Sequence, residues 1–502
     1  MFTRLKSAAP IGLDCKAVDV EVDINKGQTN FNIVGLPDTS IQEAKSRIYS
    51  AIKNSDFDYP FNFRILVNLA PADLHKEGAA YDLPMAVGIL SVSCGYFFDI
   101  NDSLIVGELA LDGSLRHTNS ILPLAIFAKH HQIKKIFVPA CNAAEAALVK
   151  GLEVFPVEDL RQIMAHFTGQ KQIEQYQAAE TDVESEIVSE FDMALIKGQE
   201  FVKRALEIAA SGGHNILMSG PPGSGKTLLA RTLPSILPQL NQEEALEVTK
   251  IYSVAGLLEN HYIKIRPFRS PHHTASGVAL VGGGKYPRPG EISLAHRGVL
   301  FLDEFPEFPR TVLENLRQPL EDGVITISRA QGTLTFPARF ILVASQNPCP
   351  CGFSSDPDKQ CSCTAQQIIR YQKKISGPLL DRIDLHIEVP RVKFEKLSSN
   401  ELGEPSSSVR TRVEQARHIQ TERFFSLPIQ TNSEMGNTEL RKFCQLDEPS
   451  LILLKTAVTQ MHLSARAYNR ILKLARTIAD LTQVENIRQE HIAEALQFRA
   501  RQ

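Results

Sequence analysis

The stretch Gly220-Pro221-Pro222-Gly223-Ser224-Gly225-Lys226-Thr227 decides the fold of the central part of this chain of 502 residues. It fits the pattern G-x-x-x-x-G-K-S/T, in which glycines let backbone N–H groups close around a phosphate. An apolar run at 215–218 precedes it, and a helical pattern at 228–233 follows it. Because the helix start adds a positive dipole at the loop, this order predicts a parallel α/β sheet with a nucleotide site.

A second motif supplies the carboxylates that such a site needs. The apolar run at 299–302 is directly followed by Asp303 and Glu304. Ligands of open α/β sheets bind at the carboxyl ends of the strands. We therefore expect Lys226 to reach the β- and γ-phosphates, and Thr227 and Asp303 to hold Mg²⁺. Glu304 is expected to orient and deprotonate the attacking water, so the pattern predicts hydrolysis of ATP or GTP.

The chain divides into four parts by composition. At about 150 residues per domain, its length suggests roughly three domains. Residues 1–168 and 193–395 carry short β-rich runs that alternate with helical stretches, which is typical of α/β domains. Residues 169–192 are polar and acidic and are predicted to be a linker. Residues 396–502 are predicted to form a helical lid.

Charge and cysteine usage limit the partners and the compartment. Lys and Arg number 54 and Asp and Glu 57, so the net charge is 54 − 57 = −3. Any DNA contact must then come from local basic loops. The sequence has no apolar run long enough for a membrane span and shows no secretory signal, so we expect no membrane partner. Four clustered cysteines in a long chain favour the reducing cytoplasm.

Several longer motifs are more specific than the phosphate loop. They are Phe268-Arg269-Ser270-Pro271-His272-His273-Thr274, Arg288-Pro289-Gly290-Glu291-Ile292-Ser293-Leu294-Ala295-His296, Asn347-Pro348-Cys349-Pro350-Cys351-Gly352 and Asp381-Arg382-Ile383-Asp384-Leu385. They add to Gly198-Gln199-Glu200, which together with Glu304 directly after Asp303 looks like an AAA+ ATPase. Together they resemble the magnesium-chelatase-like AAA+ ATPases, and within them the ComM (YifB-like) competence proteins. The resemblance covers nearly the whole chain and implies an AAA+ core with a helical lid.

The resemblance assigns three more residues to ATP hydrolysis. Asn347, after an apolar run at 340–344, matches the sensor-1 residue that helps to place the lytic water. Arg382 matches the arginine finger, which a neighbouring subunit offers to the γ-phosphate because the transition state spreads negative charge over its oxygens. Arg466 matches sensor 2, with Arg470, one helical turn further on, as the competing choice.

Two insertions that line the ring's pore in this family match residues 266–290 and 324–337. The first holds Lys285 and Arg288 beside an aromatic residue, which suits phosphate contact and base stacking. The second reads as a hairpin that places Arg329 near its tip. We expect these three cations to bind DNA; the alternative is a pair of solvated loops. Adjacent His272 and His273 suggest metal ligands at first sight, but a structural or pore-loop role is preferred.

The first 168 residues resemble a Lon-protease-like (S5-like) fold, also seen in RadA-type recombination proteins. The matching pieces lie at 76–84 and 107–113. Ala80 stands where the nucleophilic Ser of an active Lon would be, and Leu122 falls in the stretch that would carry its Lys. Since no Ser–Lys pair is left to attack a peptide, we expect no proteolysis. The domain is expected to pack subunits or bind DNA.

Four cysteines form a separate cluster in the sequence. Cys349, Cys351, Cys361 and Cys363 read C-x-C-x₉-C-x-C. Four thiolates in one short polar loop suit tetrahedral Zn²⁺, although a two-residue spacing is tight for two ligands of one metal. A disulfide pair or free thiols are the alternatives. The other four cysteines are predicted to be core residues.

The resemblance implies an ATP-driven ring motor on single-stranded and branched DNA. It implies a homo-hexameric helicase that promotes branch migration while incoming single strands are integrated in natural transformation, with recombinase or loader partners. Two other functions remain open: the ATPase subunit of a magnesium chelatase and a Lon-type protease. The Lon-like first domain argues against the former, and the missing Ser–Lys pair against the latter.

Overall fold

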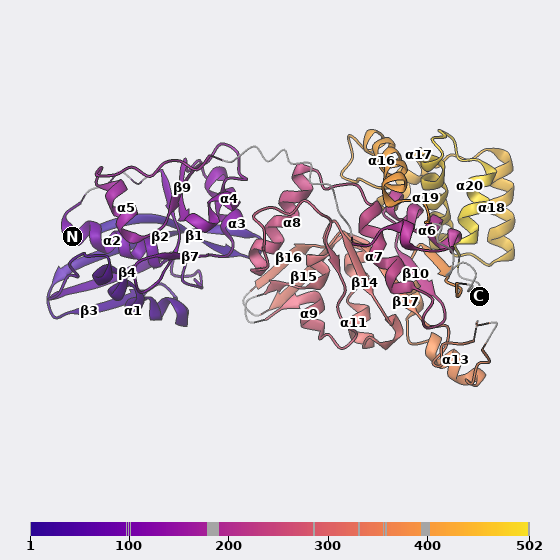
Figure 1. Cartoon of the computed structure of the whole chain (residues 1–502), viewed down its shortest axis with the longest axis horizontal. Helices are drawn as coiled ribbons and strands as arrows, with labels where there is room; N and C mark the ends of the chain where they lie inside the picture. Colours follow the sequence, from indigo (N-terminus) through magenta and orange to yellow (C-terminus); the bar gives the residue numbers. More distant parts are fainter. Residues whose placement is uncertain are drawn as a thin grey trace. The chain divides into compact units, whose positions relative to one another are not determined.

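The chain folds into two compact units, one of which is built from two separate stretches. The computed structural model describes residues 2–96, 98, 100, 102–177, 190–284, 287–329, 332–354, 356, 359–392 and 402–499. The first unit comprises Met1–Glu184 and Ala245–Ile263, and the second comprises Ser185–Glu244 and Lys264–Gln502 (Figure 1).

The stretch 245–263 differs from the boundary that composition suggests, because it lies within the predicted range 193–395. It belongs to the first unit for two physical reasons. Leu246 packs against the buried apolar cluster around α3 (Ile121–His130). The hydroxyl of Ser253 donates a 2.6 Å hydrogen bond to the buried carboxylate of Glu145. Both contacts join residues far apart in the sequence, which composition and periodicity do not reveal.

A seven-stranded sheet forms the centre of the first unit. Its spatial order is β3-β4-β2-β1-β5-β8-β9, with β1–β2 and β2–β4 antiparallel and the other pairs parallel. The strands are β1 (Phe2–Ile11), β2 (Asp14–Lys26), β3 (Asn30–Val34), β4 (Phe63–Ala70), β5 (Ser103–Ile105), β8 (Lys135–Pro139) and β9 (Glu153–Val157). A small separate ladder joins β6 (Glu108–Leu109) to β7 (Leu115–Arg116).

Helices cover this sheet and close its core. Besides α3 they are α1 (Thr39–Asn54), α2 (Asp82–Cys94), α4 (Ala143–Ala146) and α5 (Leu160–Phe167). The start of α1 is fixed by Asp38, whose carboxylate accepts from the backbone N–H of Ile41 at 2.8 Å. Nearly every side chain of α2 is buried, which explains why its sequence is apolar on all sides rather than on one stripe.

A five-stranded parallel sheet forms the centre of the second unit. Its order is β11-β14-β17-β10-β18, with β11 (Phe268–Arg269), β14 (Val299–Leu302), β17 (Ile341–Gln346), β10 (Ile216–Ser219) and β18 (Leu385–Glu388). Its pairs are all parallel, so the strands' carboxyl ends share one edge. The short apolar runs of the sequence are buried here on both faces, as parallel sheets require.

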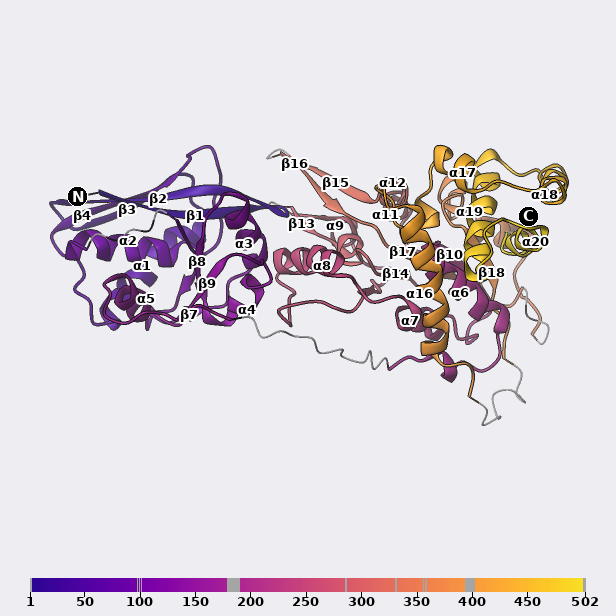
Figure 2. The ribbon, with the colours of Figure 1, turned by 90° about the horizontal axis from the view of Figure 1, so that it is seen from above.

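Short helices and two hairpins connect these strands. The helices are α6 (Glu200–Gly212), α7 (Lys226–Ile236), α9 (Gly277–Val281), α10 (Glu291–Leu294), α11 (Arg310–Glu314), α12 (Arg317–Asp322), α13 (Ala365–Gln372) and α14 (Gly377–Leu380). Helix α8 (Gln242–Ala255) lies between α7 and α9 in the chain, and from Ala245 on it belongs to the first unit. One hairpin pairs β12 (Gly282–Gly283) with β13 (Arg288–Pro289), and the other pairs β15 (Val324–Arg329) with β16 (Gly332–Pro337). Figure 2 shows β15 and β16 as a ribbon that extends beside α9 and β13.

The C-terminal part of the second unit is helical. It consists of α16 (Ser406–Arg423), α17 (Asn437–Phe443), α18 (Glu448–Gln460), α19 (Ala465–Leu481) and α20 (Gln489–Gln497). Helices α16 and α19 both pack against α6, and their apolar faces share one core with the parallel sheet. The predicted fold class, an α/β AAA+ core with a helical lid after an α/β first domain, is confirmed. Over the described residues, no helix combines the length and apolar character that a bilayer crossing requires.

Candidate functional site

The predicted phosphate loop, Gly220–Gly225, connects β10 to α7. Gly223 and Gly225 have φ angles of +77° and +87°, a conformation that favours glycine and lets the loop turn tightly. The ammonium of Lys226 donates to the carbonyls of Gly220 (2.8 Å) and Pro221 (3.0 Å). Burial lowers the pKa of Lys226, opposed by the nearby Asp303 carboxylate. The side chain is therefore folded back over its own loop, at the place where a phosphate would sit.

Asp303 lies at the end of β14 with both carboxylate oxygens fixed. The hydroxyl of Thr227 donates to Oδ2 at 3.0 Å, and the hydroxyl of Ser345 donates to Oδ1. A carboxylate beside a hydroxyl is a donor set that suits Mg²⁺, which takes few protein oxygens and keeps waters for its other positions. Thr227 and Asp303 thus fit the predicted magnesium site.

Two residues of this site lack an obvious sequence signal. Ser345 lies on β17, two positions before Asn347, which follows the end of the strand; if the alternation of the strand continues, both side chains share one face. That period of two is the signal that identifies Ser345. Gln199, which follows Gly198 in an expected motif, donates to the carbonyls of Ser224 and Pro390, both at 2.9 Å. It therefore braces the loop from outside.

Asn347 lies beside the phosphate loop and contacts Lys226. The strands β14, β17 and β10 are neighbours, so Asp303, Asn347 and Gly220 all lie at the carboxyl edge of the sheet. The ammonium of Lys226 donates to Asn347 Oδ1 at 3.3 Å. The structure thus brings together the side chains that the sequence assigned to phosphate, Mg²⁺ and water.

Glu304 has an unusual backbone conformation directly after β14. Its φ angle is +52°, in the left-handed region, where non-glycine residues are uncommon and are concentrated at functional sites. Its backbone N–H donates to Asp303 Oδ1 at 3.0 Å. Its carboxylate Oε2 lies 3.2 Å from Nδ1 of His273, a contact that the sequence did not indicate.

Arg382 lies at the opposite edge of the same sheet. It stands between α14 and the amino end of β18, whereas the phosphate loop follows the carboxyl end of β10. Its guanidinium lies 2.6 Å from Glu321 Oε1 and donates to the carbonyl of Pro378 at 2.6 Å. The Arg382 bond lowers the pKa of Glu321. Within one subunit, Arg382 therefore lies at the amino end of the strands, away from its own phosphate loop.

Arg466 and Arg470 line the same cavity as Arg382 but differ in their partners. This cavity of about 560 Å³ lies between the amino ends of the strands and the lid. Arg470 is buried, donates to the carbonyl of Ile383 at 2.9 Å and lies 3.8 Å from Asp384. Arg466 is exposed on the first turn of α19. Arg470 thus has an internal structural role, and Arg466 is the more accessible of the two.

The two predicted pore loops lie together. The β15–β16 hairpin pairs Val324 with Pro337 and Arg329 with Gly332, as the sequence predicted. Ile327 packs over Gly282, where an added Cβ would come within 3.0 Å of its Cδ1.

The side chain of Arg329 runs close to the first loop, because a Cβ added to Gly283 would lie 3.2 Å from Arg329 Nη2. Arg288 and Arg329 are both exposed. Lys285 lies outside the described residues. Two of the three cations predicted to contact DNA are therefore on adjoining tips.

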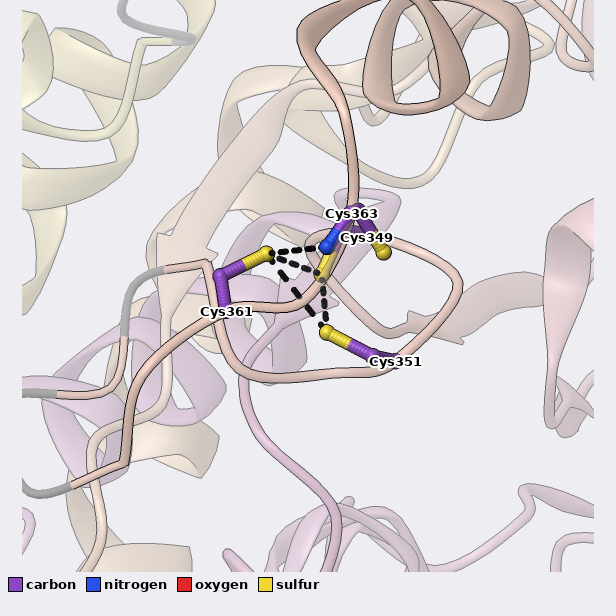
Figure 3. A group of neighbouring side chains, drawn as sticks. All are labelled: Cys349, Cys351, Cys361 and Cys363. Atoms are coloured by element: carbon purple, nitrogen blue, oxygen red, sulfur yellow. Dashed lines mark hydrogen bonds between the residues drawn. The ribbon is translucent and has the colours of Figure 1, made fainter.

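The four clustered cysteines converge on one point (Figure 3). Their four sulfur atoms all lie within 4.8 Å of one another, and the Sγ atoms of Cys349, Cys351 and Cys361 are 3.3–3.7 Å apart. Ligands at about 2.3 Å from a tetrahedral Zn²⁺ have sulfur–sulfur separations of about 3.8 Å. Backbone N–H groups, that of Phe353 first, lower the pKa of Cys351 to about 5.

The other four cysteines do not share one environment. Cys444 is buried and Cys15 is partly buried, whereas Cys94 and Cys141 are exposed. The expectation of four core residues is wrong for the last two. Cys94 is the last residue of α2 and Cys141 lies in a single 3-10 turn (Ala140–Asn142), two places where apolar periodicity gives no signal of burial.

The first unit holds the positions that match the Lon dyad. Ala80 lies just before α2, and Leu122 is fully buried in the first turn of α3. The backbone N–H of Leu122 donates to the Glu145 carboxylate at 2.9 Å. Neither position has a side chain able to attack a peptide bond.

Three family descriptions match successive parts of the chain. "Magnesium chelatase, subunit ChlI" matches residues 192–397, "Subunit ChlI of Mg-chelatase" matches residues 20–142, and "Magnesium chelatase, subunit ChlI C-terminal" matches residues 403–499. The first corresponds to the unit with the phosphate loop, and the last to the lid helices.

Relatives that match nearly the whole chain identify a narrower group within this family. The chain is 44% identical to the competence protein ComM of Haemophilus influenzae and 43% identical to the uncharacterized protein YifB of Escherichia coli, each over 98% of this chain and 96% of the relative. The magnesium-chelatase 38 kDa subunit of Rhodobacter capsulatus is 30% identical over 32% of this chain and 50% of that protein. The chain belongs to the ComM/YifB-like group of the magnesium-chelatase family of AAA+ ATPases.

Proposed function

We propose that this protein is an ATP-driven ring motor that moves on DNA and promotes branch migration. Its task is then to help integrate incoming single strands in natural transformation or homologous recombination. The observation that carries the proposal is the similarity to a competence protein along nearly the whole of both chains. The grouping of the ATP-site side chains and the two adjoining basic loops support it.

In this proposal ATP is hydrolysed at the interface between two subunits. Lys226 binds the β- and γ-phosphates, while Thr227 and Asp303 hold Mg²⁺, which neutralises the charge that develops on the phosphate oxygens. Glu304 takes the proton of the attacking water, with Asn347 placing that water. The edge with the partly buried Arg382 and the exposed Arg466 would face the phosphate loop of the neighbour, a head-to-tail contact that closes into a ring, which we propose to be a homo-hexamer.

The adjoining loops are the proposed DNA path. A net charge of −3 leaves the chain without a general attraction for phosphates, so exposed cations at loop tips must provide it. Lys285, Arg288 and Arg329, repeated by each subunit, would surround a strand that passes through the ring. Recombinase or loader partners belong to the same proposal.

The cysteine cluster is proposed to hold one structural Zn²⁺. Its loop begins directly after Asn347, and a Cβ added to Gly352 would come within 2.6 Å of Pro222 in the phosphate loop. A metal bound there would hold in place the backbone that follows β17 and Asn347. The donor set and the sulfur spacing favour zinc over a disulfide, since three sulfurs lie at similar distances.

The ATPase subunit of a magnesium chelatase is the second candidate, because the family descriptions carry that name. Against it stands the comparison of relatives: the magnesium-chelatase 38 kDa subunit of Rhodobacter capsulatus matches 32% of this chain, whereas the competence protein ComM matches 98% of it. A Lon-type protease is a third and weaker candidate, because Ala80 and Leu122 replace the dyad. A casein-degradation assay should give no cleavage.

One experiment decides between the first two candidates. Purified protein is incubated with ATP and a labelled four-way or three-strand junction, with Lys226→Ala as the matched negative control. The proposal expects DNA-stimulated hydrolysis and strand separation that both require Lys226. Hydrolysis that ignores DNA, together with an intact junction, would remove the proposed motor and leave the chelatase-type ATPase.

A further inference from the structure

The cysteine cluster (Cys349, Cys351, Cys361 and Cys363) begins beside two parts of the candidate ATP site. Cys349 is fully buried and follows Asn347 by two residues. Gly352, in the same loop, lies against the phosphate loop, because a Cβ added to it would come within 2.6 Å of Pro222 Cδ. A shift of the cysteine loop would therefore reach both Asn347 and Pro222.

The end of the cluster determines where helix α13 starts. Cys363 directly precedes Thr364, the residue that caps this helix. The hydroxyl of Thr364 accepts from the backbone N–H of Gln367 at 3.3 Å, and the side chain of Gln367 accepts from the backbone N–H of Thr364 at 2.9 Å. Such a reciprocal cap fixes the first turn of a helix. The start of α13 is thus one peptide bond away from a member of the cluster.

The other end of α13 contacts the chain that follows Glu304. The ammonium of Lys374, two residues after the helix, lies 3.0 and 2.8 Å from the two carboxylate oxygens of Glu307. The same ammonium lies 5.2 Å from the ring centre of Tyr371. The ion pair is well exposed, so it orients the two segments more than it stabilises them. Helix α13 therefore connects the cysteine cluster to the segment after β14.

Tyr371 extends this connection into the ATP site, because its side chain is almost fully buried there. Burial raises the pKa of its hydroxyl to about 12, and the nearby carboxylates of Glu307 and Glu304 and the thiol of Cys349 act in the same direction. A hydrogen bond from the backbone of Asn347 opposes this rise in the pKa. The hydroxyl thus stays protonated at physiological pH and lies among groups that follow β14 and β17.

We propose that the cysteine cluster and the nucleotide site are energetically coupled, and that Tyr371 is a positioning residue for ATP hydrolysis. Zn²⁺ on the four thiolates fixes both ends of the loop between Asn347 and α13. The Tyr371 hydroxyl is then held on the backbone of Asn347, whose amide contacts Lys226. Because coupling between two sites is reciprocal, nucleotide bound at Lys226 must also strengthen zinc binding. The inference rests on the ATP and zinc sites of the proposed function.

The first test measures the zinc affinity of the whole protein. Wild type competes for Zn²⁺ with a zinc-selective chelator, with and without a non-hydrolysable ATP analogue and Mg²⁺. We expect the analogue to raise the chelator concentration that removes half of the zinc about fivefold or more, the lower end of typical coupling. Lys226→Ala, which loses the cation for the phosphates, is the matched control and should show no change. Equal chelator midpoints in wild type would overturn the coupling.

The reciprocal measurement uses wild type from which the metal has been removed. It should bind the ATP analogue more weakly by the same factor, and added Zn²⁺ should restore the affinity. A nucleotide affinity that ignores zinc, in protein that demonstrably binds both, would contradict the first result and overturn the coupling.

Tyr371→Phe tests the positioning role, because it keeps the ring and removes only the hydroxyl. We expect kcat for ATP to fall about three- to tenfold, the size of one hydrogen bond, while KM and zinc content stay as in wild type. Tyr468→Phe, at a partly buried tyrosine that packs on the core shared by sheet and lid, is the control and should keep kcat. An unchanged kcat in Tyr371→Phe, or a loss of zinc, would overturn the positioning role.

The outcomes separate this inference from the proposed function. Wild type that contains no zinc would overturn the coupling together with the proposed zinc site, and Tyr371→Phe would still decide the positioning role. None of the measurements includes DNA, so a failure of the proposed DNA motor would leave their results standing. Wild type that binds no nucleotide would overturn the ATP site itself.

Discussion

The ammonium of Lys226 and the amide oxygen of Asn347 lie 3.3 Å apart, which joins the phosphate loop to the end of β17. The two residues are 121 positions apart in the chain. A phosphate that draws Lys226 away from the carbonyls of Gly220 and Pro221 must also change its contact with Asn347. A bound phosphate would therefore affect the end of β17 directly, through the hydrogen bond between Lys226 and Asn347.

The first prediction separates binding from hydrolysis. Lys226→Ala should lose ATP binding, because the phosphates lose their cation. Glu304→Gln should keep ATP binding and lose turnover, because the amide cannot accept the proton of the water. Fluorescent-nucleotide titration and phosphate release measure the two steps. Near wild-type hydrolysis by Glu304→Gln would show that another group acts as the base.

The second prediction concerns the edge with Arg382. Arg382→Ala should leave nucleotide affinity intact and slow hydrolysis by about 10³ or more, the scale of an arginine finger. Mixing Arg382→Ala with Lys226→Ala subunits should restore some activity, since a mixed interface can carry both intact residues. The rate of phosphate release against mixing ratio gives the measurement.

Glu321→Gln is the control for that experiment. It weakens the internal pair of Arg382 but leaves the guanidinium in place, so most of the activity should remain. A loss as large as that of Arg382→Ala would mean that the pair itself, inside one subunit, is what matters. Absence of rescue in mixtures that demonstrably exchange subunits would count against action on a neighbour.

The third prediction concerns the metal. Protein purified without chelator should contain about one Zn²⁺ per subunit, as four-cysteine structural sites do. Cys351→Ser or Cys361→Ser should release it, whereas Cys94→Ser, at an exposed cysteine of the first unit, should not. Elemental analysis is the measurement. A zinc content near zero in wild type would rule out the site.

The fourth prediction concerns the DNA-binding loops. Each phosphate contact adds about 0.9 to the slope of log K against log salt on duplex DNA, or about 0.7 on single strands. Arg288→Ala and Arg329→Ala should therefore flatten this slope and weaken binding without regard to sequence, and leave basal hydrolysis in place. Arg488→Ala, at an exposed arginine of the lid, is the control. Unchanged slopes in both loop variants would place the DNA elsewhere.

The fifth prediction follows from His386 on β18. Burial, with help from the charge on Arg499, lowers the pKa of His386 to about 4. Since the unfolded chain has the ordinary value of about 6.5, it binds more protons between pH 4 and 6.5, and stability is lost as the pH falls through that window. The loss is at most about 3 kcal/mol.

Thermal unfolding of the full chain between pH 7 and 5 measures the effect. His386→Gln keeps a donor for the carbonyl of Ile383, which the ring contacts at 3.1 Å, but cannot be protonated. Its unfolding temperature should fall less steeply with acid than that of wild type. Equal slopes would show that other groups, such as Asp384 and Arg470 nearby, determine the response.

The sequence predicts that the side chains of the candidate ATP site lie together, because each part of the pattern is local. Neighbouring residues identify each part: a phosphate loop after one strand, a carboxylate after a second and an Asn after a third. A parallel sheet must bring the carboxyl ends of these strands to one edge. The pairs Arg382–Glu321 and His273–Glu304 could not be predicted in this way. Each joins elements whose distance depends on how a loop folds back, and neither has a fixed spacing in the chain.

The segment 245–263 also determines where the protein can be divided. A fragment that ends at Glu184 contains the whole seven-stranded sheet, yet it lacks Ser253, which donates to the nearly inaccessible carboxylate of Glu145. Cutting there leaves a buried acceptor short of a donor and strips Leu246 from an apolar surface. Residues 1–184 alone are therefore not the whole first unit. They need residues 245–263 as well, from the same chain or as a separate peptide. Through Ala245–Ile263, a segment that lies within the ATPase sequence, the N-terminal unit depends on the ATPase part of the chain for its own fold.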